Sequence, residues 1–219
     1  MEDLLKQILK MMPHHTDTLA FISGLAPTLE ERIKSMIATV VLAEEDFGEE
    51  YMNEHRGHFW GLTETRPYMR ARAGLADLLC EAGMLDEAIA ECEEMIDLNP
   101  GDNQGMRDIL LGLYLECNNL AGARDLMERY KETFFAVFNW GKVLERFLSG
   151  DLAGARKACE HARQKNRFVK DLLTGKQAMP DELIAGYSPG TREEAIFCMD
   201  MLGVAWDSHP EAIEWLRGQ

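Results

Sequence analysis

His55 and His58, beside Glu54, are the side chains best suited to metal chemistry. Residues three apart on a helix share a face, so the two imidazoles could converge on one ion. A zinc or di-iron site needs further ligands, and the sequence offers no third ligand nearby and no second Glu-x-x-His motif. Helix-end packing accounts better for both histidines; a small helical metal protein or enzyme that uses His55 and His58 is the alternative.

Four arginines form the one basic concentration that stands out in the sequence: Arg66, Arg70, Arg72 and Arg107. Guanidinium groups bind carboxylates and phosphates through paired hydrogen bonds. Interhelical ion pairs with acids such as Asp77 explain the cluster most simply. The second explanation is a regulatory module that binds a small anionic ligand through Arg66, Arg70 and Arg107.

Motifs for nucleophilic or nucleotide chemistry are missing from the sequence, which has no G-x-S-x-G, Walker loop, G-x-G-x-x-G or H-E-x-x-H. We therefore expect neither catalytic residues nor a cofactor, and we predict that the protein is not an enzyme.

Charge and cysteine usage narrow the class of protein further. The chain of 219 residues has 23 Lys and Arg against 38 Asp and Glu, a net charge of −15. Such acidity argues against binding to nucleic acid or to an anionic membrane surface. The five cysteines are scattered without a C-x-x-C motif, which favours free thiols in a reducing compartment. No apolar run reaches the ~20 residues that span a bilayer, and acids stand at the N-terminus where a signal peptide carries bases. We expect a cytoplasmic protein.

Helix-forming residues dominate and alternating β-branched runs are nearly absent, so the sequence predicts an all-α fold. Two capping boxes mark helix starts, at Thr28 with Glu31 and at Thr191 with Glu194.

A six-residue pattern recurs three times, at 83–88, 118–123 and 150–155, with spacings of 35 and 32 residues. Each copy lies between two segments with helical apolar periodicity. A repeat of ~34 residues that forms a helix-turn-helix has the period of the tetratricopeptide repeat. Such units bury their apolar faces by stacking on their neighbours.

Residues 67–162 resemble the tetratricopeptide repeat (TPR) superfamily. The first unit carries the motif residues Leu75, Ala76, Leu79, Gly83, Ala88 and Pro100. Segments 58–62, 64–70 and 99–105 are similar to bacterial TPR proteins related to the suppressor-of-tumorigenicity-type family, over residues 50–219. The resemblance implies an α-solenoid of antiparallel helix pairs with helical caps and without catalytic residues. The expected organisation is an N-terminal helical region at 1–66, about three repeats at 67–169, and a connector with capping helices at 170–219.

In this family, five positions of the first helix of each unit line a concave face that binds a protein or peptide. The partner-binding residues implied here are Arg70, Asp77, Glu81, Asp108, Glu116 and Trp140. Their acids favour a partner with a basic segment. Chaperone-binding relatives hold a carboxylate with Lys and Asn where this chain has Ala73 and Asp77, so the clamp is absent. The third unit's apolar face either exposes Trp140 as an anchor or is covered by the C-terminal helices.

Overall fold

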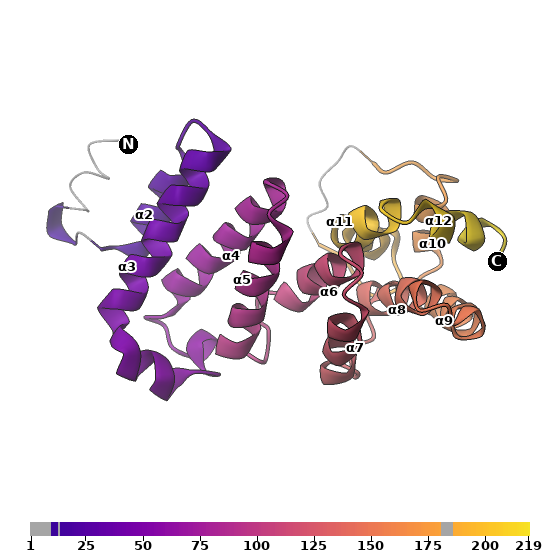
Figure 1. Cartoon of the computed structure of the whole chain (residues 1–219), viewed down its shortest axis with the longest axis horizontal. Coiled ribbons are helices and arrows are strands. Elements are labelled where there is room, and N and C mark those ends of the chain that lie inside the picture. The colour runs from indigo at the N-terminus through magenta and orange to yellow at the C-terminus, as the bar shows by residue number, and fades with distance from the viewer. Residues whose placement is uncertain (1–9, 13, 181–185) are drawn as a thin grey trace. The chain divides into compact units, whose positions relative to one another are not determined.

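The computed structural model describes residues 10–12, 14–180 and 186–219, and this part of the chain is helical without strands (Figure 1). The chain divides into two compact units, Met1–Met106 and Arg107–Gln219, which we call unit 1 and unit 2. The all-α prediction is confirmed. The repeats expected at 67–169 are shared between the two units. Residues 1–9 and 13 of the expected N-terminal region, and 181–185 of the expected connector, lie outside the described residues.

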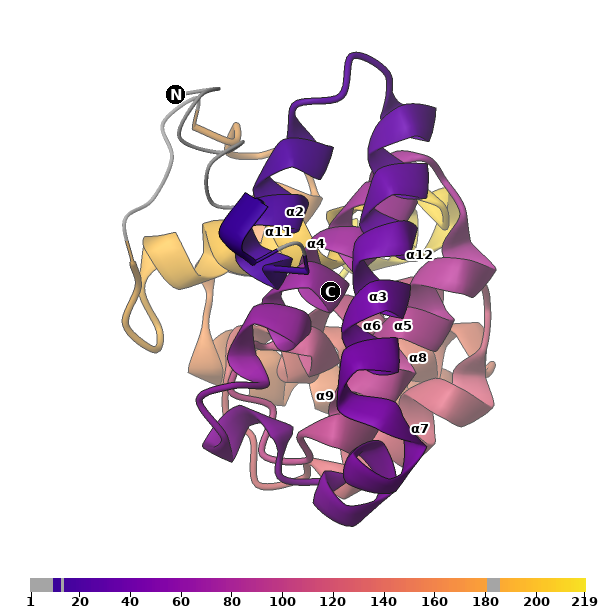
Figure 2. The same cartoon turned by 90° about the vertical axis from the view of Figure 1, so that its left-hand side faces the viewer.

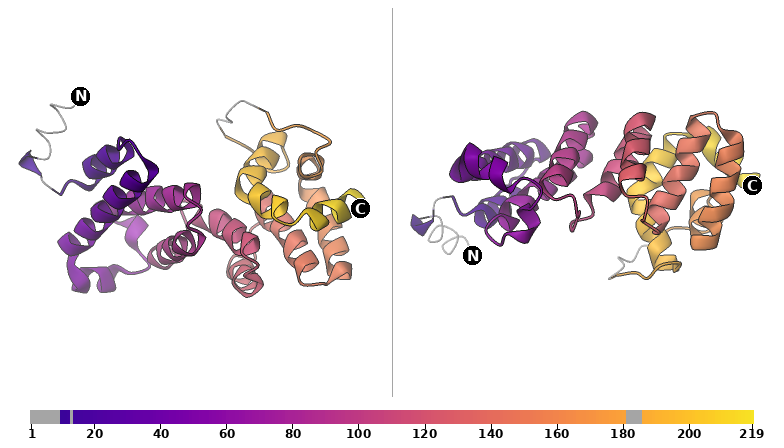
Figure 3. Two further views of the ribbon diagram at one scale, coloured as in Figure 1. Left: turned by 45° about the horizontal axis from the view of Figure 1, so that its top comes forward. Right: turned by 90° about the horizontal axis from the view of Figure 1, so that it is seen from below.

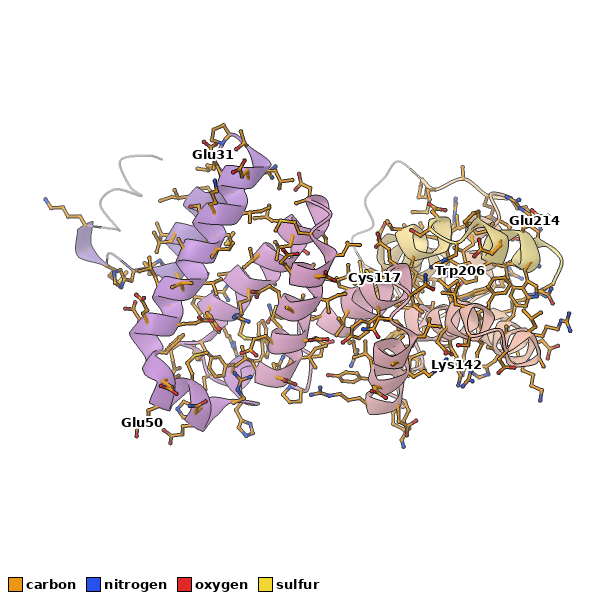
Figure 4. The ribbon with its side chains drawn as sticks, viewed as in Figure 1. Glu31, Glu50, Cys117, Lys142, Trp206 and Glu214 are labelled. Carbon is orange, nitrogen blue, oxygen red and sulfur yellow. The ribbon has the colours of Figure 1, made fainter. Side chains whose placement is uncertain are left out.

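In the described part of unit 1, from residue 14 on, the helices are α2 (Thr16–Gly24), α3 (Leu29–His55), the short 3₁₀ helix η1 (Phe59–Gly61), α4 (Arg66–Glu81) and α5 (Leu85–Leu98). Helix α2 packs on α3 and α4, and α4 packs on α3 and α5. A loop joins α2 to α3 at the top of Figure 2, and α3 runs from near Glu31 at one end to near Glu50 at the other (Figure 4).

Both halves of the capping box at the start of α3 form as predicted. The Thr28 side chain accepts from the Glu31 backbone N–H, and the Glu31 carboxylate accepts from the Thr28 N–H. Beyond it, α3 continues to His55 through a kink at Gly48, where φ is 75° and ψ is 158°. Glycine adopts this backbone conformation without the steric cost of a Cβ atom.

Unit 2 contains the remaining helices, the first of which begins at the last residue of unit 1: α6 (Met106–Glu116), α7 (Leu120–Arg129), α8 (Ala136–Leu148), α9 (Leu152–Lys165), α10 (Phe168–Leu173), α11 (Arg192–Asp207) and α12 (Pro210–Arg217). Helices α8 and α9 lie side by side (Figure 3), and both α11 and α12 pack on α8.

The three repeated segments form turns with the same backbone geometry. Gly83, Asn118 and Gly150 each adopt a left-handed conformation, with φ of 68°, 57° and 78°. In each turn the next residue donates its N–H to the carbonyl five residues back, at 3.0, 2.7 and 3.0 Å. The left-handed residue itself donates to the carbonyl three residues back. This pair of hydrogen bonds is the Schellman motif, which satisfies the free carbonyls at a helix C-terminus.

A small residue follows each of these turns at the same place in the second helix. Ala88, Ala123 and Ala155 have no exposed surface. Their methyl groups let the two helices of a hairpin approach closely. The three segments are thus helix-turn-helix units with matching turns, one in unit 1 and two in unit 2.

The second predicted capping box forms only in part. Thr191 accepts from the Glu194 N–H as expected. The Glu194 carboxylate instead accepts from the Ala136 N–H, the Asn166 side-chain amide and the Gly190 N–H, at 3.0, 2.9 and 2.6 Å. Glu194 is 2% exposed. A buried carboxylate requires such donors, and here they connect α11 to the start of α8 and the end of α9.

Candidate functional site

The predicted binding residues of α4 lie on a helix whose surface is held mainly by contacts within unit 1. The Arg70 guanidinium donates to Asp17, with 2.7 Å between Nη2 and Oδ2 and 3.1 Å between Nε and Oδ1. Glu81 accepts from the Arg32 Nη2 at 3.2 Å. Both side chains therefore have intramolecular ion pairs, which a partner would have to replace.

Asp77 differs from its neighbours on α4 because no ion pair or hydrogen bond engages its carboxylate within the described part of the chain. The residue is exposed, yet partial burial raises the pKa of its carboxyl above the usual value. Removal from water disfavours a charge that has no counterion. Among the described residues, Asp77 is therefore a partly buried carboxylate without a counterion.

The predicted α6 residues belong to unit 2, and the two halves of the expected acidic face are therefore described separately. Asp108 is buried, at 8% exposure. Glu116 is half-buried, and its burial raises the pKa of the carboxyl. On α6, Gly112 lies against the Met201 backbone of α11, and the Leu115 carbonyl accepts a hydrogen bond from the His209 Nε2 at 3.1 Å. Part of the α6 surface is thus in contact with the C-terminal segments.

Trp140 is not an exposed anchor, and this expectation is corrected. Its side chain has no exposed surface, and its Nε1 donates to the Asn166 carbonyl at 3.2 Å. The physical reason is that α11 and α12 pack on α8. The Phe147 ring of α8 meets Trp215 of α12 at 5.3 Å between centroids, and Trp206 of α11 is fully buried. The alternative, that the C-terminal helices cover the third unit's apolar face, is the one the structure has.

His55 and His58 do not come together with further ligands. The His55 ring packs edge-on against Tyr51, with centroids 4.3 Å apart, and His58 is exposed in the following turn. Within the described residues, no group of three or more His, Cys, Asp or Glu side chains is arranged to hold a metal ion.

The arginine cluster is also separated by its local contacts. Arg66 donates its Nε to the Trp60 carbonyl at 3.0 Å and lies over the Trp60 ring. Arg72 pairs with Glu44 at 2.8 Å and Glu91 at 3.3 Å. Arg107 belongs to unit 2, where it lies over the Tyr130 ring. Internal ion pairing therefore explains Arg70 and Arg72, although their acids are Asp17, Glu44 and Glu91, none of which was expected.

The sequence interpretation missed how unevenly charge is distributed. Unit 1 has eight Lys and Arg against 21 Asp and Glu, a net charge of −13; unit 2 has 15 against 17, a net charge of −2. Within unit 2, residues 120–176 contain 12 basic and seven acidic residues. A count by segment would have revealed this basic stretch, which the net charge of the whole chain conceals.

Searches against protein-family models, curated proteins and solved structures find no match to this chain. In the part of the chain that the structure describes, no helix combines the length and apolar character needed to cross a membrane.

Proposed function

We propose that this chain is a non-catalytic helical-repeat scaffold, a TPR-like α-solenoid that binds a protein or peptide. The observation that carries the proposal is a difference between equivalent helix faces in two of the three hairpins. The α8 face is apolar and holds α11 and α12 of the same chain. At the matching positions of α4, Arg70, Asp77 and Glu81 are exposed. The face that is apolar and covered within unit 2 thus has an exposed, charged counterpart on α4, where Asp77 has no ion pair among the described residues.

The partner is a segment with a lysine or arginine that reaches Asp77. A cation there removes the electrostatic cost that raises the pKa of the Asp77 carboxyl. Binding should consequently lower that pKa and release protons at a pH where Asp77 is partly protonated. The five cysteines are free thiols, which fits a reducing compartment, and we place the scaffold in the cytoplasm.

The test uses a partner isolated from the native host on the immobilised full-length chain. Its affinity is then measured for the wild type, for Asp77→Asn and for a control, Glu50→Gln, which removes an exposed carboxylate from α3. We expect Asp77→Asn to weaken binding by about tenfold, because a hydrogen bond to a charged group contributes roughly 1.5–3 kcal/mol. The control should retain wild-type affinity at each salt concentration.

Affinity should also fall as salt rises, since an ion pair at the exposed Asp77 is screened. An affinity that ignores both salt and Asp77→Asn would contradict recognition of a basic segment at α4.

A further inference from the structure

A cavity of about 510 Å³ in unit 2 has a strongly basic lining. Helices α9, α10 and α12 and the turns beside them supply the lining residues. Five are basic, one is acidic and one carries a hydroxyl group: Arg163, Arg167, Lys170, Lys176, Arg217, Asp171 and Thr174. Counting these side chains gives a net of four positive charges around one cavity, in a protein whose net charge is −15.

Three of the five cations have partners beside the cavity. Lys176 pairs with Asp171 at 3.3 Å, and Arg217 pairs with Glu214 at 2.7 Å. The Lys170 Nζ donates to the Gln219 main-chain oxygen at 2.9 Å. These contacts orient three of the positive groups, and the lining residues together keep an excess of positive charge.

The other two cations, Arg163 and Arg167, are exposed and make no ion pair or hydrogen bond within the described residues. The Arg167 guanidinium lies 5.0 Å from the centre of the Phe168 ring. A cation–π contact of this kind orients the group and leaves its N–H donors available at the edges. Within the described residues, nothing therefore competes with an anion for paired hydrogen bonds to these two guanidinium groups.

The backbone between Arg163 and Arg167 is constrained by the hydrogen bonds of Asn166, which is 1% exposed. Its carbonyl accepts from the Trp140 indole N–H, and its side-chain amide donates to the Thr191 carbonyl and to Glu194. Asn166 also ends α9 in an extended conformation, with φ of −149°. Arg163 and Arg167 therefore project from a backbone that is fixed before any ligand arrives, which reduces the entropic cost of binding.

We propose that this cavity binds a small soluble anion that carries more than one phosphate group. Its volume lies within the roughly 300–1,000 Å³ typical of small-molecule sites. Arginine matches the geometry of phosphate oxygens through its planar fork of donors. Several separated cations favour several anionic groups on one ligand. The C-terminal ends of α9 and α12 each contribute only about half a negative charge, less than the four net positive charges of the lining.

This site is independent of the proposed function, because it uses neither Asp77 nor any residue of α4. Its occupation would neutralise cations that otherwise repel one another across the cavity, so the ligand should stabilise unit 2. Hydrogen exchange in α9, α10 and α12 should therefore slow when the ligand is added.

The experiment is calorimetric titration of the full chain with inorganic pyrophosphate at constant ionic strength. The site variant is Arg163→Gln/Arg167→Gln. The matched control is Arg156→Gln/Lys165→Gln, which removes the same charge from exposed positions of α9 that do not line the cavity. We expect binding of pyrophosphate to the wild type and the control, and affinity at least about tenfold weaker in the site variant.

Circular dichroism of each variant establishes that it is folded, and Lys176→Gln gives a second site variant that should also weaken binding. Inorganic phosphate should bind more weakly than pyrophosphate, and sulfate at matched ionic strength should not replace it. Sedimentation with phosphatidic acid vesicles separates a free ligand from a lipid headgroup, and we expect no co-sedimentation. Equal losses in the site and control variants, no heat beyond that of sulfate, or preferential binding to the vesicles would each overturn the proposal.

Discussion

Units 1 and 2 organise their charged side chains in opposite ways. Unit 1 has the greater excess of acidic residues, and each of its five arginines contacts an acid or a carbonyl of the same unit: Arg32, Arg56, Arg66, Arg70 and Arg72. Unit 2 is nearly neutral, yet it leaves Arg163 and Arg167 exposed without an ion pair in the described residues. The sign of a net charge therefore does not reveal which charges are available to a ligand. Availability depends on which side chains the fold has already paired.

The equivalent faces of α4 and α8 differ in the same way. On α8, the apolar residues are covered by other helices of the chain. Asp77 on α4, by contrast, is exposed and has no ion pair among the described residues. The turns at Gly83, Asn118 and Gly150 give both units the same turn geometry, and the side chains decide whether a helix face is covered by other helices of the chain.

The largest expected effect comes from removing the most buried arginine of unit 1. The Arg72 side chain is 10% exposed, lies over the Tyr68 ring and pairs with Glu44 and Glu91. Arg72→Met should destabilise unit 1 by about 3–5 kcal/mol, because it leaves two acids close together without a counterion. Chemical denaturation with hydrogen exchange in α4 measures this loss.

The control for that comparison is Arg163→Met in unit 2, which removes an exposed and unpaired cation. Its cost should stay within about 0.5 kcal/mol in the absence of ligand. Similar losses for the two variants would show that pairing does not distinguish the arginines of the two units.

A smaller loss of stability tests the feature that the two units share, which is the buried alanine in the second helix of a hairpin. Ala88→Leu in unit 1 and Ala155→Leu in unit 2 place a larger side chain at the same point of a hairpin, where neither alanine has exposed surface. Each should cost about 1–3 kcal/mol through overpacking. Ala90→Leu, at an exposed position of α5, serves as the control and should change stability little. An unchanged denaturant midpoint for Ala88→Leu would mean that the repeat register is wrong.

The Arg56–Glu94 pair provides a pH-dependent test of unit 1. Two hydrogen bonds, at 3.1 and 2.8 Å, hold the pKa of Glu94 below its usual value of 4.5. The folded state then binds fewer protons than the unfolded state, so the pair stabilises above the unfolded pKa and loses its effect as pH falls through the folded pKa. Arg56→Gln should cost about 0.3–1 kcal/mol at neutral pH. In urea denaturation across acid pH, that difference should shrink; a constant difference would contradict the assignment.

The smallest expected change in stability comes from neutralising a carboxylate whose pKa is raised by burial alone. Asp77 in unit 1 and Glu116 in unit 2 are two such carboxylates. A raised pKa means that the folded state binds more protons, so stability falls as pH rises between the unfolded and folded values. Asp77→Asn and Glu116→Gln should therefore stabilise the protein slightly at neutral pH and have no such effect below both pKa values. Thermal melts at the two pH values compare the variants, and a loss of stability at neutral pH would reveal a counterion for the altered acid.

Local features of the fold were predictable from the sequence because their interactions lie close together in the chain. The Thr28–Glu31 capping box and the three turns at Gly83, Asn118 and Gly150 involve residues at most five apart. Non-local partners were not predictable in this way. The Glu194 carboxylate does not cap its own helix as expected and instead accepts a hydrogen bond from the Ala136 N–H, 58 residues away.

The candidate site shows the same limit. Arg70 and Glu81 were correctly placed on the first helix of a hairpin, but their partners Asp17 and Arg32 lie 53 and 49 residues earlier. A pattern within one helix cannot indicate such pairing. The burial of Trp140 depends likewise on α11 and α12, whose contact with α8 follows from the fold and not from the local sequence.

The cover that α11 and α12 provide for α8 has a consequence during synthesis. Helix α8 ends at Leu148 and α12 ends at Arg217, so the apolar face around Trp140 leaves the ribosome well before the residues that will cover it. At about 5–20 residues per second, that interval lasts roughly 3–14 s. A nascent chain halted after α9 should thus expose this apolar surface to chaperones, whereas a chain released after α12 should have it covered.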